Sequence, residues 1–227
     1  MTEILNANTT ALQAILDAVN NLPDAGGSSG DSRELDIYLE GNVTDLTSNA
    51  TTIGKYIFYL NTVIETVNLP LVASIQRNAF DNCTALTTVV APSLINVGDY
   101  AFAYCSNLPT ISFPSLETIG SYSFQSCLGL GIIDLGKSIT SIGSSAFRNC
   151  SNLKVVAIRQ TASVVSSATD SFYNTPIASR TSAFVLVPSA LLASYRSATY
   201  WKNFTIQPLE NYTIDGTVTG EIDESKI

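Results

Sequence analysis

The sequence predicts an α/β solenoid, in which short parallel strands form one wall and helical or 3₁₀ turns form the opposite wall. Three observations support this prediction. Between residues 53 and 160 an apolar pattern repeats every 22 or 23 residues, four of the repeats carry a cysteine at one fixed position, and the last part of each repeat alternates between apolar and other residues. Units of this length cannot bury their apolar side alone, so neighbouring turns must stack to form a core.

The register of the five repeats is set by phenylalanines spaced 22, 22, 22 and 23 residues apart: Phe58, Phe80, Phe102, Phe124 and Phe147. A second apolar residue keeps the same step, at Ile64, Leu86, Leu108, Leu130 and Leu153. From that residue onward the later turns follow an L-x-x-L-x-L pattern, which is the signature of leucine-rich repeats. Its alternating end fits a strand with one buried face, so each turn is expected to add one strand to a parallel sheet.

The four cysteines follow the phenylalanine by three residues, at Cys83, Cys105, Cys127 and Cys150, whereas the first turn has Asn61 there. A cysteine at the same position of each repeat is typical of a side chain that packs in the core, so we expect these thiols to be buried and free. Neighbouring thiols would lie near bonding distance, which leaves oxidation to disulfides as the alternative. A zinc site is not expected, because the chain has no histidine and no C-x-x-C pair.

The segment "VGDYAFAYCSNLPTISFPSLET", residues 97–118, and its copies resemble the BspA-like branch of leucine-rich repeats. That branch is typical of bacterial surface proteins and of some phage and prophage proteins. The resemblance implies a recognition or adhesion module, and it does not identify a ligand.

The chain before the repeats divides into three predicted segments. Residues 1–22 form an amphipathic helix whose apolar positions include Leu5, Leu12 and Val19, seven residues apart. So short a helix is marginal alone, and it either docks on the solenoid or self-associates through residues 3–22. Residues 23–32 read as a flexible linker, and residues 33–52 as an N-terminal cap that closes the first turn. The helix and the following "LPDAGG" are also similar to the starts of small phage and prophage structural proteins.

After the fifth repeat the period loosens. Residues 161–210 predict a degenerate repeat, which keeps Phe172 but has Thr175 in place of the cysteine, and then a C-terminal cap. The ending, with its aromatic cluster, resembles the caps of BspA-like arrays; the cluster comprises Tyr195, Tyr200, Trp201 and Phe204. The remaining polar residues, 211–227, read as a short hairpin or frayed strand.

Charge and hydropathy exclude some classes of partner. Residues 1–45 carry one base and eight acids, whereas residues 46–153 carry four bases and five acids, so the repeat surface is almost neutral. Nucleic acid is therefore not an expected partner, because neutralising phosphates requires a basic stripe. No secretory signal is recognised after Met1, and the apolar run at 183–193 is too short to span a bilayer. We expect no membrane insertion and an extracellular or virion-associated location.

The chain shows no pattern that predicts catalysis. Residues 131–138 fit the phosphate-binding pattern G-x-x-x-x-G-K-[ST], but their middle is the predicted strand, which cannot curl around a phosphate. The chain has no histidine, which is the usual general base. The carboxylates of the repeats occupy different repeat positions, so they are not expected to form a cluster. We therefore predict no enzyme, no cofactor and no metal site.

Two surfaces are candidates for binding. The first is the outer face of the strands, rich in threonine, which either binds a flat partner or polar sugars or is simply a solvated sheet; its positions are Glu65, Thr66, Asn68, Thr87, Thr88, Val90, Thr110, Ser112, Ile132, Asp134, Val155 and Ala157. The second is a tyrosine row two residues before the phenylalanine, with two neighbours beside it, in the order Tyr56, Tyr100, Tyr122, Tyr59 and Tyr104. These rings offer apolar area and a hydroxyl to a protein or glycan, or they shield the wall between turns.

Together these features favour non-enzymatic recognition by a phage or prophage tail-associated protein that contacts a host surface. In that reading the helix attaches or oligomerises the chain, and the partner is a protein or glycan on a cell surface. The alternatives are a bacterial cell-surface adhesin and an intracellular protein-interaction scaffold.

Overall fold

A computed structural model describes residues 44–179 and 183–211 of the chain. The predicted helix (1–22), the predicted linker (23–32), the first part of the predicted N-terminal cap (33–52) and nearly all of the predicted tail (211–227) lie outside these residues.

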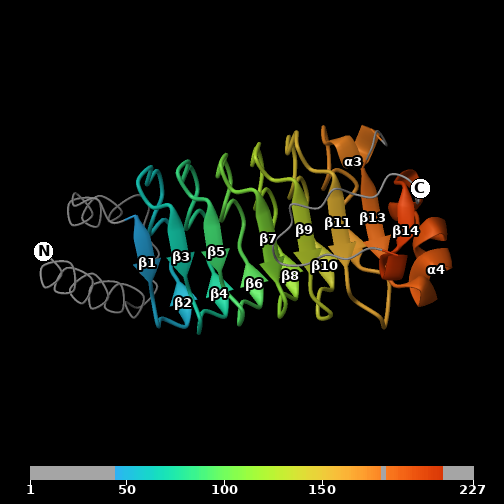
Figure 1. Cartoon of the computed structure of the whole chain (residues 1–227), viewed down its shortest axis with the longest axis horizontal. Helices are drawn as coiled ribbons and strands as arrows, with labels where there is room; N and C mark the ends of the chain where they lie inside the picture. The colour runs from blue at the N-terminus through green and yellow to red at the C-terminus, as the bar shows by residue number, and fades with distance from the viewer. Residues whose placement is uncertain (1–43, 180–182, 212–227) are drawn as a thin grey trace, which may run out of the picture.

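The described chain is a parallel-strand solenoid, and Figure 1 shows its turns stacked along the long axis. This confirms the predicted leucine-rich-repeat fold. One wall carries the longer strands, which are β1 (Asp45–Thr47), β3 (Thr66–Asn68), β5 (Thr88–Val90), β7 (Thr110–Phe113), β9 (Ile132–Leu135), β11 (Val155–Ile158), β13 (Phe184–Val187) and β14 (Ile206–Pro208). The repeat spacing fixes their register, so that Ile111 pairs with Ile133 and Ile133 with Val156.

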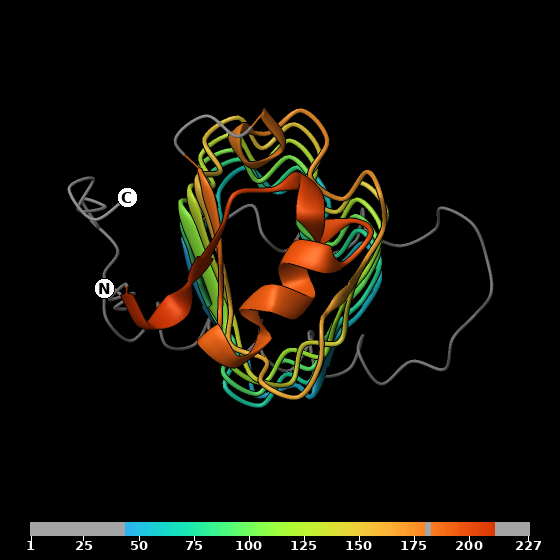
Figure 2. The same cartoon turned by 90° about the vertical axis from the view of Figure 1, so that its right-hand side faces the viewer.

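A second parallel sheet, which the sequence did not predict, runs along the stack. Its six strands have two residues each: β2 (Thr52–Ile53), β4 (Ser74–Ile75), β6 (Asn96–Val97), β8 (Thr118–Ile119), β10 (Ser141–Ile142) and β12 (Ser166–Ser167). The apolar residue of each Ile-Gly or Val-Gly pair ends a strand and is buried, as Val97 and Ile119 are. The end-on view in Figure 2 shows the successive turns superposed around one interior.

The phenylalanine segments form a wall of tight turns, which we call the turn wall, where helical or 3₁₀ turns were predicted. Residues two before or two after the phenylalanine have positive φ: Tyr56, Leu60, Asn78, Asn82, Tyr100, Tyr104, Tyr122, Ser126, Ser145, Asn149 and Asn174. A right-handed helix cannot pass through such residues. Hydrogen bonds run between turns instead; the Phe80 N–H, for example, donates to the Ala101 carbonyl at 2.8 Å.

Helices in the described residues are short and lie toward the C-terminal end (Figure 1). They are α3 (Pro176–Ser179) and α4 (Leu192–Ser197), with the 3₁₀ segments η1 (Ser189–Leu191), η2 (Trp201–Asn203) and η3 (Leu209–Asn211). None of the helices in the described ranges has the length and hydropathy of a membrane span.

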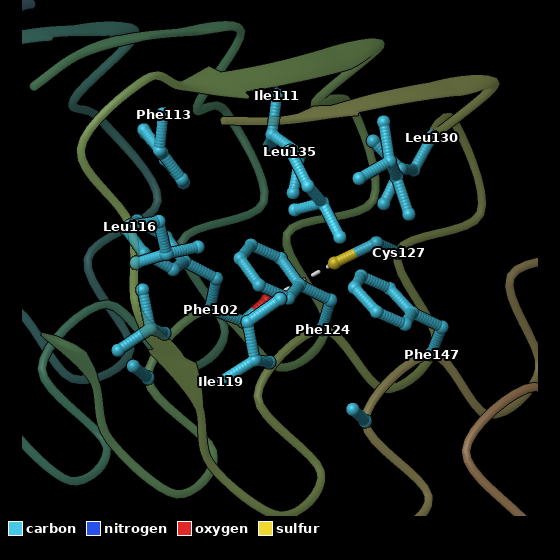
Figure 3. Packing of buried hydrophobic residues seen from close by; sticks show 14 of the residues in the cluster. Phe102, Ile111, Phe113, Leu116, Ile119, Phe124, Cys127, Leu130, Leu135 and Phe147 are labelled. Atoms are coloured by element: carbon cyan, nitrogen blue, oxygen red, sulfur yellow. Dashed lines mark hydrogen bonds between the residues drawn. The ribbon is translucent and has the colours of Figure 1, made fainter. Parts of the chain in front are cut away.

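Stacked phenylalanine rings fill the core. Consecutive rings from Phe58 to Phe172 have centroids 4.9 to 5.3 Å apart and lie nearly parallel. The four cysteines are buried and free, which confirms the first of the two predicted alternatives. Each thiol donates to the carbonyl of the phenylalanine one turn back, as Figure 3 shows for Cys127 and Phe102 at 3.1 Å.

The first wall is interrupted between β5 and β7, which divides it into a three-stranded and a five-stranded sheet. Pro109 stands at the interruption. At the same repeat position in other turns, the backbone N–H donates to a main-chain carbonyl of the preceding turn. The N–H of Thr87 donates to the carbonyl of Glu65 at 2.8 Å, and that of Lys154 to the carbonyl of Gly131 at 2.9 Å. Proline has no N–H, so the ladder lacks a bond at this turn.

The aromatic cluster predicted near the C-terminus packs on the end of the phenylalanine column. Trp201 is 1% exposed, and its ring centroid lies 6.0 Å from that of Phe172. Its Nε1–H donates to the Val165 carbonyl at 2.7 Å, while the Val165 N–H donates to the Tyr195 hydroxyl at 3.0 Å. Both polar ring groups are thus satisfied in the interior. That residues 161–210 act as a cap stays a prediction.

Candidate binding surfaces

The turn wall carries the predicted tyrosines in two groups. In the first turn Tyr56 is 42% exposed and meets Tyr59 edge to face, with 5.8 Å between centroids. In the third and fourth turns Tyr100 and Tyr122 are half-buried and stack at 4.8 Å, and Tyr104 beside them is 41% exposed. The structure therefore brings Tyr100 and Tyr122 into contact and separates them from the first pair, whereas Tyr104, on the other side of Phe102 in the same turn, contacts Gln125.

Four of these tyrosines have a left-handed backbone, with φ of 61° at Tyr56, 57° at Tyr100, 59° at Tyr104 and 58° at Tyr122. Positive φ is uncommon for bulky residues, and asparagine tolerates it far better. Equivalent positions in other turns do carry asparagine, at Asn78, Asn82, Asn149 and Asn174. Backbone conformation therefore does not explain why tyrosine stands at these positions.

A polar cluster in the second turn separates the two groups of tyrosines. The Asp81 carboxylate accepts hydrogen bonds from Asn78 at 2.7 Å and Asn82 at 2.8 Å, and Arg77 donates to Asn78 at 3.1 Å. Burial raises the pKa of Asp81, although the two amide bonds act in the opposite direction. The Arg77 guanidinium also lies 5.5 Å from the centroid of the Tyr100 ring, which links this cluster to the second group.

Sequence reasoning missed three exposed apolar residues on or beside the turn wall: Leu60 at 56%, Tyr173 at 57% and Leu128 at 48%. Leu60 follows its phenylalanine by two residues, as Tyr104 does, so this column of the alignment could have identified it. Tyr173 lies in the degenerate turn beyond the regular period. The Arg148 guanidinium lies 4.9 Å from the centroid of the Tyr173 ring.

The outer strand face divides into an open and a closed part. Thr88 and Ser112 are exposed, Thr66 and Thr110 are half-buried, and Thr66 donates its hydroxyl proton to Asp45. Toward the C-terminal end the Asp134 carboxylate forms an ion pair. It accepts two bonds from Arg159, at 2.7 and 2.8 Å, a partner that the sequence did not indicate.

The prediction that Val155 and Ala157 belong to an open outer face is wrong. They are 5% and 0% exposed, and they contact Phe184 and Leu186, which are 6% and 1% exposed. We call these four residues the outer cluster. Apolar side chains from β11 and β13 pair across the outside of the sheet, so the polar, Thr-rich face does not extend to these strands.

A groove of about 650 Å³ lies between the degenerate turn and the C-terminal aromatic cluster, with Tyr173, Tyr200 and Phe204 in its lining. Asp170 also lines it, but its carboxylate is held by the hydroxyls of Ser145, at 2.6 Å, and Ser144, at 3.0 Å. These bonds, with that of Ser145 the strongest, lower the pKa of Asp170.

Within residues 44–179 and 183–211, no three histidine, cysteine or acidic residues are grouped to hold a metal ion. The phosphate-motif match at 131–138 contains β9, whose four residues form a regular ladder with β7 and β11. The predicted strand is therefore present where a phosphate loop would need to curl.

Taken together, these features define a leucine-rich-repeat solenoid, a class that typically serves as a non-enzymatic binding scaffold. A model of the BspA type leucine rich repeat region matches six copies, over residues 41–115 and 73–184, and the chain belongs to this family.

Two solved structures show the same fold. A leucine rich repeat protein of T. pallidum (TpLRR) is 24% identical, with a TM-score of 0.52 and coverage of 70% of this chain and 85% of that one. The pneumococcal vaccine antigen PcpA is 16% identical, with a TM-score of 0.59 and coverage of 76% of this chain and 42% of PcpA. No curated protein matches the chain.

Proposed function

We propose that the chain is a recognition module whose turn wall binds a protein or glycan at a cell surface, without catalysis. One observation carries the proposal: tyrosines occupy left-handed positions where asparagine would fit with less strain, and two of them, Tyr56 and Tyr104, are more than 40% exposed. Exposed tyrosines supply rigid contact area and a hydroxyl at low entropic cost. The nearly neutral repeat surface fits an uncharged or weakly charged partner.

The test compares the two candidate surfaces on the full chain. Binding to intact bacterial cells is measured for the triple variant Tyr56→Asn, Tyr104→Asn, Tyr122→Asn and for a control triple on the strand face, Thr88→Asn, Thr110→Asn, Ser112→Asn. We expect the first to lose binding by at least about tenfold, as the loss of central aromatic contacts would produce, and the second to bind as the parent does. The opposite result assigns binding to the strand face.

The chemical class of the partner follows from pretreatment of the cells. Periodate cleaves the vicinal diols of glycans, whereas a protease removes surface proteins. Loss of binding after only one treatment identifies the class. Binding that neither treatment reduces would contradict a surface protein or glycan as the partner.

The setting is either a phage or prophage tail or a bacterial cell surface, and the turn wall would serve both. Self-association through residues 3–22 would favour a multivalent tail-associated protein. Light scattering after size exclusion, for the full chain and for a chain that begins at Ser32, tests this. An oligomer that becomes a monomer on truncation supports the tail-associated setting. If the full chain and the truncated chain are both monomeric, the adhesin and scaffold alternatives are as well supported as the tail-associated setting.

A further inference from the structure

The groove beside the degenerate turn lies where a further turn of the solenoid would stack. In the regular turns the residue two after the phenylalanine donates its N–H to a main-chain carbonyl of the next turn, at 2.7 to 3.0 Å; these residues are Leu60, Asn82, Tyr104, Ser126 and Asn149. Asn174 holds this position in the degenerate turn and lines the groove. Its φ of 57° falls within the range of 57° to 64° that the five others have, so its N–H points toward the missing turn. Within residues 44–179 and 183–211, no group accepts that N–H.

Next to this donor, a hydroxyl takes the place of the next turn's carbonyl. The phenylalanines of the five regular turns donate their N–H to a carbonyl of the next turn at 2.8 Å, whereas the Phe172 N–H donates to the Tyr200 hydroxyl at 3.3 Å. The aromatic cluster thus completes the inner part of the interface between turns and leaves the outer part, at Asn174, open. A carbonyl from a bound peptide would continue this interface, because peptide recognition commonly extends an unfinished row of main-chain hydrogen bonds.

Asp170 gives the groove a negative charge, and the other residues that line it are uncharged. The groups that donate to its carboxylate are neutral, namely the hydroxyls of Ser144 and Ser145 and the Ser145 N–H. These bonds lower the pKa of Asp170, so the carboxylate is ionised at neutral pH. No lysine or arginine of the described chain forms an ion pair with it, since Arg148 lies over the Tyr173 ring instead. A carboxylate with no cation beside it favours a positively charged ligand.

Aromatic rings supply the apolar part of the lining. Tyr173 is 57% exposed, and the half-buried rings of Tyr200 and Phe204 have centroids 4.9 Å apart. An arginine side chain suits both parts of the groove, because a guanidinium forms charge-assisted bonds with a carboxylate and also packs on aromatic rings. The volume of about 650 Å³ lies within the range of about 300 to 1,000 Å³ that is common for ligand sites.

We propose that this groove binds a peptide segment of a partner protein through one arginine side chain and one main-chain carbonyl. The arginine lies along the aromatic rings and pairs with Asp170, and the carbonyl accepts the Asn174 N–H. This site goes beyond the proposed function of the turn wall, because it uses none of the tyrosines Tyr56, Tyr104 and Tyr122. It gives the chain a second place of attachment, at the end of the stack.

Titration of the isotope-labelled full chain with a short peptide, followed by nuclear magnetic resonance, tests the site. The probe is a blocked peptide with one arginine between two alanines on each side. We expect the amide resonances of Tyr173, Asn174 and Phe204 to shift and that of Thr88, on the strand face, to stay in place. The same peptide with citrulline, which has nearly the shape of arginine and no charge, should bind about fivefold more weakly, as expected for the loss of one accessible ion pair.

A substitution then tests the role of the carboxylate. Asp170→Asn removes the charge and keeps an oxygen for the serine hydroxyls, so it should weaken binding of the arginine peptide about fivefold and leave that of the citrulline peptide unchanged. Asp99→Asn is the matched control, because Asp99 is also half-buried and accepts a backbone N–H, from Ser121 at 2.8 Å. This control should bind both peptides as the parent does.

Three results would overturn the proposal: no shifted resonances at millimolar peptide, equal affinity for the arginine and citrulline peptides, or shifts that leave out Asn174. Shifts of the groove residues with lactose and not with the peptide would overturn it in favour of a glycan. The comparison of the two peptides uses the parent chain, so it decides the question even if Asp170→Asn disturbs the fold. The resonances belong to the groove itself, so the result does not depend on whether the turn wall binds cells.

Discussion

The thiol of Cys105 donates a hydrogen bond to the main-chain carbonyl of Phe80, one turn earlier, with 3.1 Å between sulfur and oxygen. The same bond recurs at 3.0 to 3.1 Å from Cys83, Cys127 and Cys150. A row of small side chains thus ties each turn to the preceding one inside an apolar core. Thr175 ends the row, because its hydroxyl donates at 2.7 Å to Phe172 of its own turn.

Cys105→Ala should destabilise the fold by about 1–2 kcal/mol, because it removes a buried sulfur and leaves a small cavity. The free energy of unfolding from urea denaturation measures this. The control is Ser106→Ala, next to it in sequence but only partly buried, for which we expect a change within about 0.5 kcal/mol. Equal stability of the two variants would show that the thiol row contributes nothing.

Alkaline pH should destabilise the protein through the same thiols. Burial raises the pKa of Cys150 from its usual 9.0 to about 12. Between these values the unfolded chain has released the proton and the folded chain retains it, so the free energy of unfolding falls by about 1.4 kcal/mol per pH unit for this thiol. Below pH 9 both states are protonated and the contribution is constant.

Urea denaturation of the parent and of Cys150→Ala between pH 7 and 11 isolates this effect. The variant lacks one titrating thiol, so the stability gap between the two proteins should narrow above pH 9. Tyrosine ionisation affects both proteins alike. A gap that stays constant across the range would contradict the raised pKa.

Gly120→Ala should cost about 2–4 kcal/mol, because an added Cβ would lie 2.7 Å from the backbone nitrogen of Asp99 and from the backbone carbon of Gly98. Gly131→Ala is the matched control. There the nearest atom is the Asn152 carbonyl oxygen at 3.7 Å, so the change should be neutral or slightly stabilising. Thermal unfolding of both variants would show whether close backbone contact between turns accounts for the Ile-Gly pairs.

Tyr104→Asn should leave stability unchanged or raise it by up to about 1 kcal/mol, since asparagine relieves a left-handed backbone. Its hydroxyl accepts one exposed bond, from Gln125 at 3.1 Å, whose loss should cost little. Binding to cells should nevertheless weaken. A clear loss of stability would instead support the alternative that the tyrosines shield the wall.

Most of the solenoid could be predicted from sequence, because the repeat itself fixes the stacking register. The phase of Phe102 and Cys105 predicted their burial, and the alternation after Leu108 predicted β7. The turn wall could not be predicted in detail, because its left-handed positions are occupied by several residue types, including tyrosine, leucine, asparagine and serine. Two-residue strands such as β8 are too short for an alternating pattern to be recognised.

The candidate surfaces were predicted only in part. The tyrosine row follows from spacing alone, but the polar cluster around Asp81 that divides it depends on contacts between side chains. Alternation correctly assigned Val155 and Ala157 to the outer face of the sheet. It could not show that Phe184 and Leu186 bury them there, because that depends on contacts between side chains of neighbouring turns.

The only tryptophan, Trp201, contacts the last ring of the phenylalanine column and none of the earlier ones. Each turn of a solenoid touches only its neighbours, so the fluorescence of Trp201 reports on unfolding of the C-terminal turn and does not detect unfolding of the first turns. Circular dichroism averages over all strands. The difference between the two unfolding curves therefore measures how far the opposite ends of the molecule melt independently, without any added label.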